Sequence, residues 1–220
     1  MTMTAPLRET SESTPEPAAG TTPSTALMAV RPGAVILTRH GEPALSRKCL
    51  ITARQYRDWW GQYEVGGLRA GQTPPRELLD AAQGAGAIYA STRKRAQETA
   101  AAVAAGREVM SDALFIEAPL PPPAAPDFIK LSPRWWGVVS RIWWRLFNHH
   151  HQEETHAQAR LRAEQAAQIL IGRAEAGQDV LVLAHGYFNH MVGKRLKANG
   201  WRLADDQGFR YWSQRRYEKR

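Results

Sequence analysis

Short apolar runs alternate with helix-like segments along most of this chain, and this alternation constrains its fold more than any other feature. Residues 34–38 and 180–184 are apolar runs with β-branched residues, as expected for strands buried on both faces. Residues 87–90 and 114–117 are shorter candidates. Helical periodicity fills the intervals, at residues 94–105, 155–176 and 188–198. This order predicts an α/β fold, a three-layer sandwich with a mainly parallel sheet and helices on both faces.

Residues 1–33 have a different composition, rich in Thr, Ser, Pro, Ala and Gly. Such a segment buries too little apolar surface to offset its ordering entropy, so we predict a disordered tail at 1–33 and a folded domain at 34–220. Charged residues interrupt the tail, which is unlike a secretory signal, and no stretch approaches the roughly 20 apolar residues of a membrane span. The chain is therefore expected to be cytoplasmic.

Net charge and cysteine content restrict the partners and the chemistry. The formal charge is +8 with a pI near 10.0, which favours anionic partners such as phosphorylated small molecules, nucleic acid or acidic lipid. Cys49 is the single cysteine, which excludes an intramolecular disulfide and any Cys-rich metal site.

Chemically capable side chains follow each predicted strand. Residues 39–42 (RHGE) follow the first strand and residues 91–95 (STRKR) the second, while Glu117 ends the third and His185 follows the fourth. Ligands of open α/β sheets bind beyond the carboxyl ends of the strands. Two imidazoles, a basic cluster and a carboxylate are therefore expected to meet at one edge of the sheet.

This combination of side chains points to phosphoryl transfer. Arginines offer planar donors that match phosphate oxygens, and a neutral imidazole can attack phosphorus to form a phosphohistidine. A carboxylic acid can supply the proton that the leaving alcohol needs. Protein cations neutralise the charge of the transferred group, so this chemistry requires no metal and no other cofactor.

Three motifs resemble the signatures of the histidine phosphatase superfamily, also called the phosphoglycerate mutase-like family. Residues 38–42 (TRHGE) look like its Arg-His-Gly signature. Residues 91–100 (STRKRAQETA) are similar to its second motif, which has a Ser, then an Arg-Ala pair, then Thr-Ala. Residues 181–186 (LVLAHG) resemble its third, an apolar strand ending in His-Gly. The resemblance runs in order from about residue 34 to about residue 196 and implies a histidine phosphatase domain.

The resemblance implies a role for each matched residue. His40 would be the nucleophile that becomes phosphorylated, and Arg39 and Arg95 would bind the phosphoryl oxygens. Arg95 matches rather than Arg93, because the arginine of the family motif directly precedes the alanine. His185 would donate to the phosphoryl group as the second imidazole of the pocket.

The proton donor of the family is usually a Glu at a strand end shortly after the helix of the second motif. Glu117 matches by position, although the residues after it lack the usual glycine context. Glu42 is the alternative, because it adjoins the expected pocket. Gly41 would let the backbone turn tightly beside the nucleophile.

These features together predict a phosphomonoester hydrolase that acts on a small phosphorylated substrate through a phosphohistidine. One alternative is a mutase, which would return the phosphoryl group to another substrate hydroxyl. Another is a non-catalytic module that binds anions or nucleic acid on this scaffold. The intact set of catalytic residues favours the enzyme, and no nucleic-acid partner is expected. The oligomeric state stays open.

Residues 119–152 form a Pro- and Trp-rich insert. Its prolines predict a stiff opening stretch, and Ser132-Pro133 is typical of a helix start. In the helix that follows, one face would carry Trp135, Val139, Ile142 and Leu146, flanked by Trp136, Val138, Trp143 and Phe147. The opposite side would carry Gly137, Ser140, Arg141 and Arg145. Trp144 falls among these polar residues, where we expect it to be exposed.

The insert helix allows three interpretations. The simplest is that its aromatic face packs on the core. A second is that it forms a lid or wall over the phosphate pocket and contacts an apolar part of the substrate. The third is that it lies on acidic lipid, with Arg134, Arg141 and Arg145 toward the headgroups.

Two further segments carry conspicuous residues. His149, His150 and His151 are consecutive, so they do not converge on one ion easily, and we predict an exposed stretch without a metal. Residues 208–220 are basic and contain three aromatic side chains. We expect an alternating terminal strand with solvated basic residues there, in preference to a nucleic-acid-binding segment.

Overall fold

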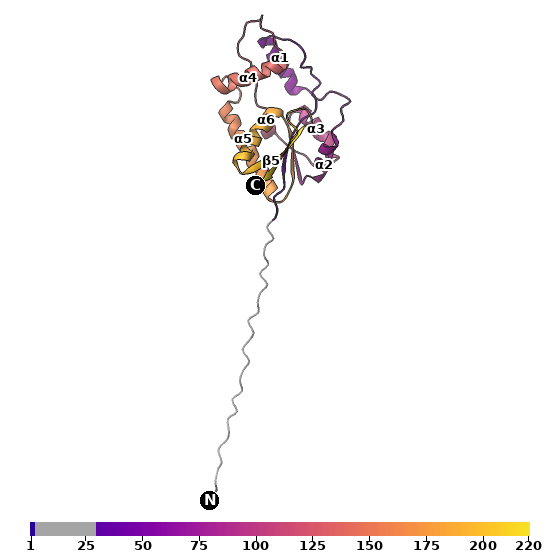
Figure 1. Ribbon diagram of the computed structural model, residues 1–220, viewed down its shortest axis with the longest axis vertical. Helices are drawn as coiled ribbons and strands as arrows, with labels where there is room; N and C mark the ends of the chain where they lie inside the picture. Colours follow the sequence, from indigo (N-terminus) through magenta and orange to yellow (C-terminus); the bar gives the residue numbers. More distant parts are fainter. Residues whose placement is uncertain (3–29) are drawn as a thin grey trace.

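The computed structural model describes residues 1–2 and 30–220 (Figure 1). The predicted disordered tail, residues 1–33, therefore falls almost entirely outside the described residues. The rest of the chain forms one α/β unit.

A six-stranded sheet runs through the centre of this unit, in the order β3-β2-β4-β1-β6-β5. Its strands are β1 (Val35–Arg39), β2 (Ala87–Ser91), β3 (Met110–Asp112), β4 (Val180–Ala184), β5 (Trp201–Asp206) and β6 (Gln214–Lys219). β1 to β4 are parallel, whereas β6 runs antiparallel to both β1 and β5. The predicted mainly parallel sheet is confirmed, with an antiparallel hairpin at one edge.

The register of the sheet aligns the ends of its central strands. Arg39 at the end of β1 pairs with Ala184 at the end of β4, and Ala90 of β2 pairs with Leu183. His40 and His185 are the next residues along their strands, so the parallel register brings them to the same edge.

Helices cover both faces of the sheet, which confirms the three-layer arrangement. α2 (Arg76–Gly84) and α3 (Lys94–Ala104) lie on one face, and α5 (His156–Glu175) and α6 (Gly186–Ala198) on the other (Figure 1). Side chains along each strand alternate between the two cores. In β1, Ile36 joins the cluster beside α2 and α3, whereas Val35 and Leu37 join the cluster beside α5 and α6.

The strand predicted at 114–117 is wrong. The strand is Met110–Asp112, and Ala113–Phe115 forms a 3₁₀ turn. The Asp112 carboxylate accepts a hydrogen bond from the Leu114 backbone N–H at 2.8 Å, which starts the turn directly after the strand. Phe115 is buried against Tyr89, so its apolar character reflects core packing and not a place in the sheet.

Two helices, α1 (Ala53–Val65) and α4 (Pro133–Phe147), lie together beyond the carboxyl ends of the central strands (Figure 1). Thr52 begins α1 with a capping box, since its hydroxyl accepts from the Gln55 N–H and the Gln55 side chain accepts from the Thr52 N–H. Stacked aromatic side chains join the two helices, namely Tyr56, Trp59, Tyr63 and Trp136. This pair covers the edge of the sheet at which the two imidazoles lie.

The predicted packing of the insert helix on its aromatic face is wrong. α4 buries the opposite side, with Trp136, Gly137, Ser140 and Trp144 inward, and it exposes Trp135, Ile142 and Leu146. Gly137 and Ser140 are small, so the helix approaches its neighbours closely there. The ring N–H groups of the two inward tryptophans bind backbone carbonyls, Trp136 that of Ile51 at 2.7 Å and Trp144 that of Glu154 at 2.9 Å.

Trp144 was expected to be exposed and is instead completely buried. Its ring also contacts His156 and Tyr187 edge-on. Because it belongs to the core cluster that includes α5 and α6, Trp144 ties the insert to the central domain.

Within the basic segment 208–220, only Gln214–Lys219 forms the expected strand, β6. Its basic side chains pair with carboxylates and are not simply solvated as expected. Arg215 binds Asp206 at 2.6 Å, Arg216 binds Asp179 at 3.1 Å, and Lys219 contacts Glu175. These pairs position the edge hairpin against its neighbours. No helix within residues 30–220 is both long and apolar enough to cross a bilayer.

Replacing Trp144 should destabilise the fold far more than replacing the exposed Trp135. We expect Trp144→Ala to lower the free energy of unfolding by about 3–5 kcal/mol, because it removes a fully buried ring and leaves a cavity. Trp135→Ala, at a side chain that is 60% exposed, should cost less than about 1 kcal/mol. Urea unfolding followed by far-UV circular dichroism measures both, and the reverse order would contradict the observed packing of α4.

Candidate active site

His40 directly follows β1 and is almost completely buried. Its Nδ1 lies 2.7 Å from the backbone oxygen of Gly41. A carbonyl oxygen only accepts, so Nδ1 carries the proton and Nε2 keeps a free lone pair. The Arg95 Nε–H donates to this Nε2 at 3.3 Å. The backbone thus presents His40 as a neutral imidazole with its nucleophilic nitrogen toward a guanidinium.

His185 follows β4 and is completely buried. Its ring centroid lies 5.1 Å from that of His40, with the two rings edge to face. The His185 Nε2 lies 2.9 Å from the Ser91 hydroxyl, and Nδ1 has no hydrogen-bond partner among the described residues. The two imidazoles therefore form one pair at the edge of the sheet, as the strand-end argument predicts.

Burial lowers the pKa of both imidazoles well below the ordinary histidine value, because a charged ring would be removed from water. The nearby guanidinium of Arg95 lowers both pKa values further, and Arg39 adds to the effect at His40. Both rings are therefore neutral at physiological pH. A neutral imidazole is the form that can act as a nucleophile.

Arg95 lies in the first turn of α3 and is completely buried. The Glu64 carboxylate binds its Nη2 at 2.9 Å, and Nη1 donates to the Tyr63 backbone oxygen at 2.7 Å. The guanidinium also lies over the Tyr63 ring, 4.4 Å from its centroid. Glu64 binds Arg93 at 2.6 Å as well, so one carboxylate holds both arginines of the second motif.

Arg39, at the end of β1, lies at the edge of a cavity. Its Nη1 donates to the Phe209 backbone oxygen at 2.6 Å, and its guanidinium lies over the Tyr211 ring, 4.1 Å from the centroid. The Tyr211 ring in turn approaches His40, with 5.8 Å between centroids. The loop between β5 and β6 therefore covers His40 and contacts Arg39.

The Glu117 carboxylate lies at the N-terminus of α6. Its Oε1 accepts from the Phe188 N–H at 2.8 Å and from the Ala118 N–H at 3.1 Å, whereas Oε2 has only a longer contact, 3.3 Å, with the Tyr187 N–H. Because α6 begins directly after His185, this capping contact holds Glu117 near the second imidazole. Glu117 also lines the cavity beside Arg39.

Glu42 lies elsewhere. Its carboxylate pairs with Arg69 at 2.8 Å, its side chain is 44% exposed, and it does not line the cavity. Of the two carboxylates considered as proton donor, the geometry therefore places Glu117 at the cavity and turns Glu42 toward Arg69.

Gly41 differs from the expectation of a tight glycine-only turn, because its φ is not positive. A side chain there would overlap the ring of Trp212, at 2.4 Å from a Cβ atom. The close approach of the Trp212 ring therefore leaves room only for a glycine at position 41. Its backbone N–H also donates to the Thr99 hydroxyl at 3.0 Å, which fixes the loop after His40.

The cavity lined by Arg39 and Glu117 has a volume of about 1030 Å³ and a strongly cationic lining. His40, Arg95 and His185 are buried and are not among its lining residues; Arg39 and Gly186, the chain neighbours of the two imidazoles, are. Glu117 is the one carboxylate of the cavity. The cationic side chains are Arg39, Arg47, Lys48, Arg134, Arg141 and Arg210. Ser132, Arg134, Val138 and Arg141 come from the insert, so the insert forms a wall of this cavity. That it contacts an apolar part of a substrate over a phosphate pocket stays a prediction.

Sequence reasoning missed several residues of this site. Glu64 carried no signal, because an acidic residue in an ordinary amphipathic helix is usually solvated. Tyr211 lies in the terminal segment for which the sequence predicts a strand. Arg47 lies in an irregular loop, and its Nη1 donates to the Tyr211 hydroxyl at 3.2 Å. All three reach the site only through the tertiary fold.

The consecutive histidines lie on the insert beyond α4. The His149 Nε2 lies 3.1 Å from the Pro122 backbone oxygen, and the side chain is half-buried, whereas His151 is exposed. Within the described part of the chain, no group of three or more His, Cys, Asp or Glu side chains is placed to hold a metal ion.

Comparisons with known proteins agree with this fold and motif order. The model of the histidine phosphatase superfamily (branch 1) matches residues 35–211. A search of curated proteins returned no match.

The solved structures that match this chain share little sequence with it. A putative α-ribazole-5′-P phosphatase from Escherichia coli is 17% identical, with 74% of this chain and 79% of that chain covered and a TM-score of 0.49. A mycobacterial glucosyl-3-phosphoglycerate phosphatase is 18% identical (76% and 80% covered, TM-score 0.48). A phosphoserine phosphatase from Entamoeba histolytica is 17% identical (76% and 80% covered, TM-score 0.48).

The family model spans five strands of the sheet, β1 to β5, and ends before β6, and it includes all three strand-end motifs. The chain belongs to the histidine phosphatase superfamily, branch 1.

Proposed function

We propose that this phosphatase hydrolyses small phosphomonoesters through a phosphohistidine on His40. One observation carries the proposal: the Nδ1–H bond to the Gly41 carbonyl leaves Nε2 of a buried, neutral imidazole unprotonated. The Arg95 Nε–H at 3.3 Å is its hydrogen-bond partner, and this long bond gives way when Nε2 attacks phosphorus. The neighbouring Arg95, Arg39 and His185 supply the donors that a phosphoryl group needs while it is transferred.

In the first step, the His40 Nε2 lone pair forms a bond to phosphorus while the bond from phosphorus to the leaving oxygen breaks. Negative charge spreads over the three equatorial oxygens, where Arg39 and Arg95 neutralise it. The leaving oxygen takes a proton from Glu117. Phe188 and Ala118 donate to Oε1 of Glu117, which leaves Oε2 able to carry this proton without loss of the cap.

In the second step, water attacks the phosphorus of the phosphohistidine. Glu117, now a carboxylate, accepts a proton from this water as the bond from phosphorus to nitrogen breaks. Inorganic phosphate leaves and His40 returns to its neutral form. A mutase would pass the phosphoryl group to a substrate hydroxyl, so release of one phosphate per substrate consumed distinguishes the two reactions.

The cavity indicates what kind of phosphomonoester fits. Arg47, Arg141 and Arg210 line it in addition to Arg39, one of the two proposed phosphoryl-binding arginines. Their charge favours a substrate that carries an anionic group beyond the transferred phosphoryl. Tyr187 and Tyr211 give the same cavity apolar surface for the rest of the molecule.

Trapping the intermediate tests this proposal. The protein is mixed with ³²P-labelled p-nitrophenyl phosphate and quenched in alkali, which preserves the phosphorus–nitrogen bond, and the labelled peptide is identified by mass spectrometry. We expect the label on His40. His40→Ala should abolish labelling and lower kcat by at least about 10³-fold. His151→Ala, which removes an exposed imidazole, is the control and should leave both unchanged. A label on another residue, or full activity of His40→Ala, contradicts the proposal.

Glu117→Gln should separate substrates by their leaving groups. We expect kcat for alkyl phosphates, whose leaving oxygens need a proton, to fall by about 10²-fold or more. With p-nitrophenyl phosphate the fall should be under about tenfold, since nitrophenolate leaves without protonation. The amide oxygen can keep the bond from the Phe188 N–H, so the fold is retained. Glu42→Gln is the control. An equal loss for both substrates would remove Glu117 from the donor role.

A further inference from the structure

The outward side of α4 is an apolar surface that no described residue covers. We call it the α4 outer face and define it as Trp135, Val138, Ile142, Trp143, Leu146 and Phe147, whose exposed fractions run from 37% to 68%. The helix is held to the domain from its other side by Trp136 and Trp144. Its outer face is therefore not required for the fold, and apolar surface of this extent marks an interaction site.

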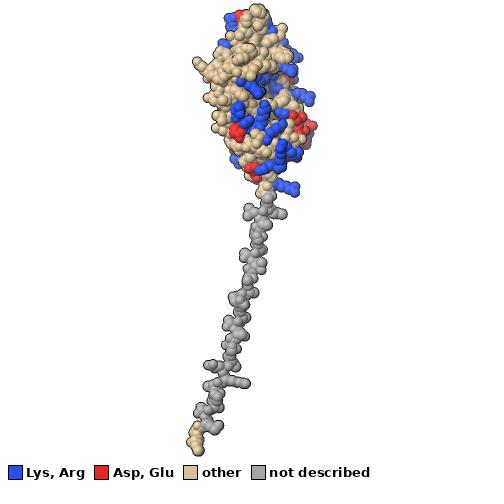
Figure 2. Space-filling model, turned by 60° about the vertical axis from the view of Figure 1, so that its left-hand side comes forward, with Lys and Arg blue, Asp and Glu red and all other residues tan. Residues whose placement is uncertain are grey.

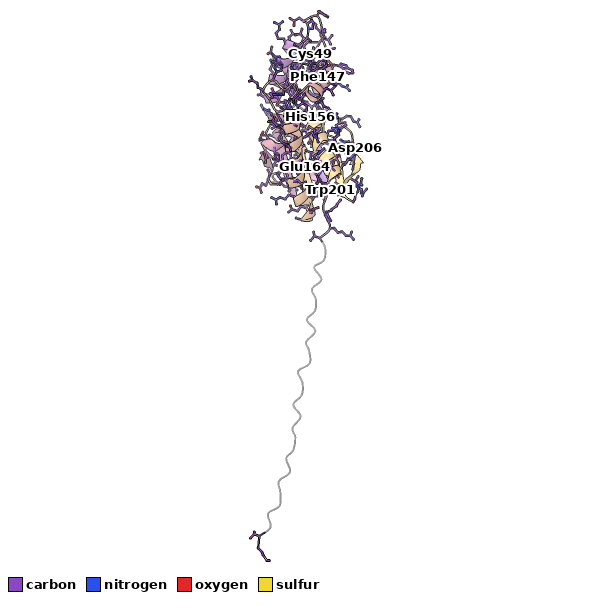
Figure 3. The ribbon with its side chains drawn as sticks, turned by 90° about the vertical axis from the view of Figure 1, so that its left-hand side faces the viewer. Cys49, Phe147, His156, Glu164, Trp201 and Asp206 are labelled. Atoms are coloured by element: carbon purple, nitrogen blue, oxygen red, sulfur yellow. The ribbon has the colours of Figure 1, made fainter. Side chains whose placement is uncertain are left out.

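Apolar side chains continue from this face onto the neighbouring segments. Leu50, Phe128 and Ile129 are exposed. They flank the paired residues Ile51, which precedes α1, and Leu131, which precedes α4. Cys49 and Phe147 lie at the same end of the domain in Figure 3. In Figure 2 the end of the domain that α4 occupies is mostly uncharged, with Lys and Arg gathered beside it.

Every charge on α4 is positive. The helix carries Arg134, Arg141 and Arg145 and has no acidic residue. Arg134 and Arg145 are exposed along the border of the outer face. A helix with Trp, Phe and Leu on one face and arginines along its border is typical of helices that lie in the plane of an anionic bilayer surface.

We propose that the α4 outer face docks this protein on anionic lipid bilayers. A second copy of the chain is the other natural occupant of an apolar face. Two copies of α4 facing each other would bring their arginines together with no carboxylate from either helix to neutralise them. Anionic headgroups neutralise the same arginines, while the acyl-chain boundary accepts the two exposed tryptophans.

Docking in this way would bring the cavity to the bilayer surface. Val138 belongs to the outer face and also lines the cavity, and Arg134 and Arg141 line the cavity from the same helix. The cavity mouth therefore borders the docking surface.

Flotation of the full-length protein with vesicles tests the proposal. The vesicles are phosphatidylcholine alone or phosphatidylcholine with about one third phosphatidylglycerol, at low and at physiological ionic strength. We expect binding to the anionic vesicles, weakened by salt, with a blue shift of tryptophan fluorescence. Binding to neutral vesicles should be at least about tenfold weaker.

A matched pair of variants identifies the surface. Ile142→Ser/Leu146→Ser changes side chains that are 45% and 68% exposed, and Ile169→Ser/Leu161→Ser changes the same residue types on α5 at 43% and 67%. The α4 variant should bind anionic vesicles at least about tenfold more weakly, whereas the α5 variant should bind like the unmodified protein. Both should keep their circular dichroism spectrum and their hydrolysis of p-nitrophenyl phosphate in solution.

Three results would overturn the proposal. The first is that the unmodified protein does not bind anionic vesicles at low salt. The second is that the two variants lose binding equally. The third is that the protein forms a dimer that only the α4 variant disrupts, without vesicle binding, which would assign the face to a second copy of the chain.

Discussion

The buried contact between the Arg95 guanidinium and the neutral imidazole of His40 is the interaction on which the rest of the site depends. Burying the Arg95 guanidinium removes its bonds to water, which costs free energy. The Glu64 carboxylate and the Tyr63 backbone oxygen replace those bonds. Burial and the positive charge of Arg95 lower the pKa of His40, so the ring stays unprotonated at Nε2 near neutral pH. In the proposed reaction, the cations that would bind the phosphoryl oxygens therefore also keep the His40 ring unprotonated.

The architecture of the sheet makes this contact possible. Parallel pairing of β1 with β4 places His40 and His185 side by side. β2 pairs with β4 and ends at Ser91, whose hydroxyl contacts His185. The chain then continues into α3, which carries Arg95. Elements outside the sheet complete the site. α1 brings Glu64, the loop between β5 and β6 brings Tyr211, and α4 forms a wall of the cavity while its other side faces solvent.

The sequence predicted those parts of the structure whose position in the fold follows from the local sequence pattern. His40 and His185 could be placed because each directly follows a buried strand, where parallel register leaves little freedom. The strand end placed only the basic cluster at 91–95, and the family resemblance selected Arg95 within it. Glu64 could not be placed, because only the packing of α1 brings it to Arg95. Periodicity located the apolar stripe of α4 correctly and its buried side wrongly, since it records where apolar side chains lie but not which side meets a neighbour. The third strand was misplaced because Asp112 ends it with a side-chain cap.

The proposed reaction needs a neutral His40 ring, and ¹H–¹⁵N correlation spectra of the imidazole nitrogens report its protonation state. Across a titration from about pH 8 to about pH 5, we expect the proton on Nδ1 and an unprotonated Nε2, down to pH values clearly below the ordinary histidine pKa of about 6.5. A proton on Nε2 of the neutral ring, or titration of His40 to imidazolium near about pH 6.5, would show that the buried ring is not held as a neutral nucleophile.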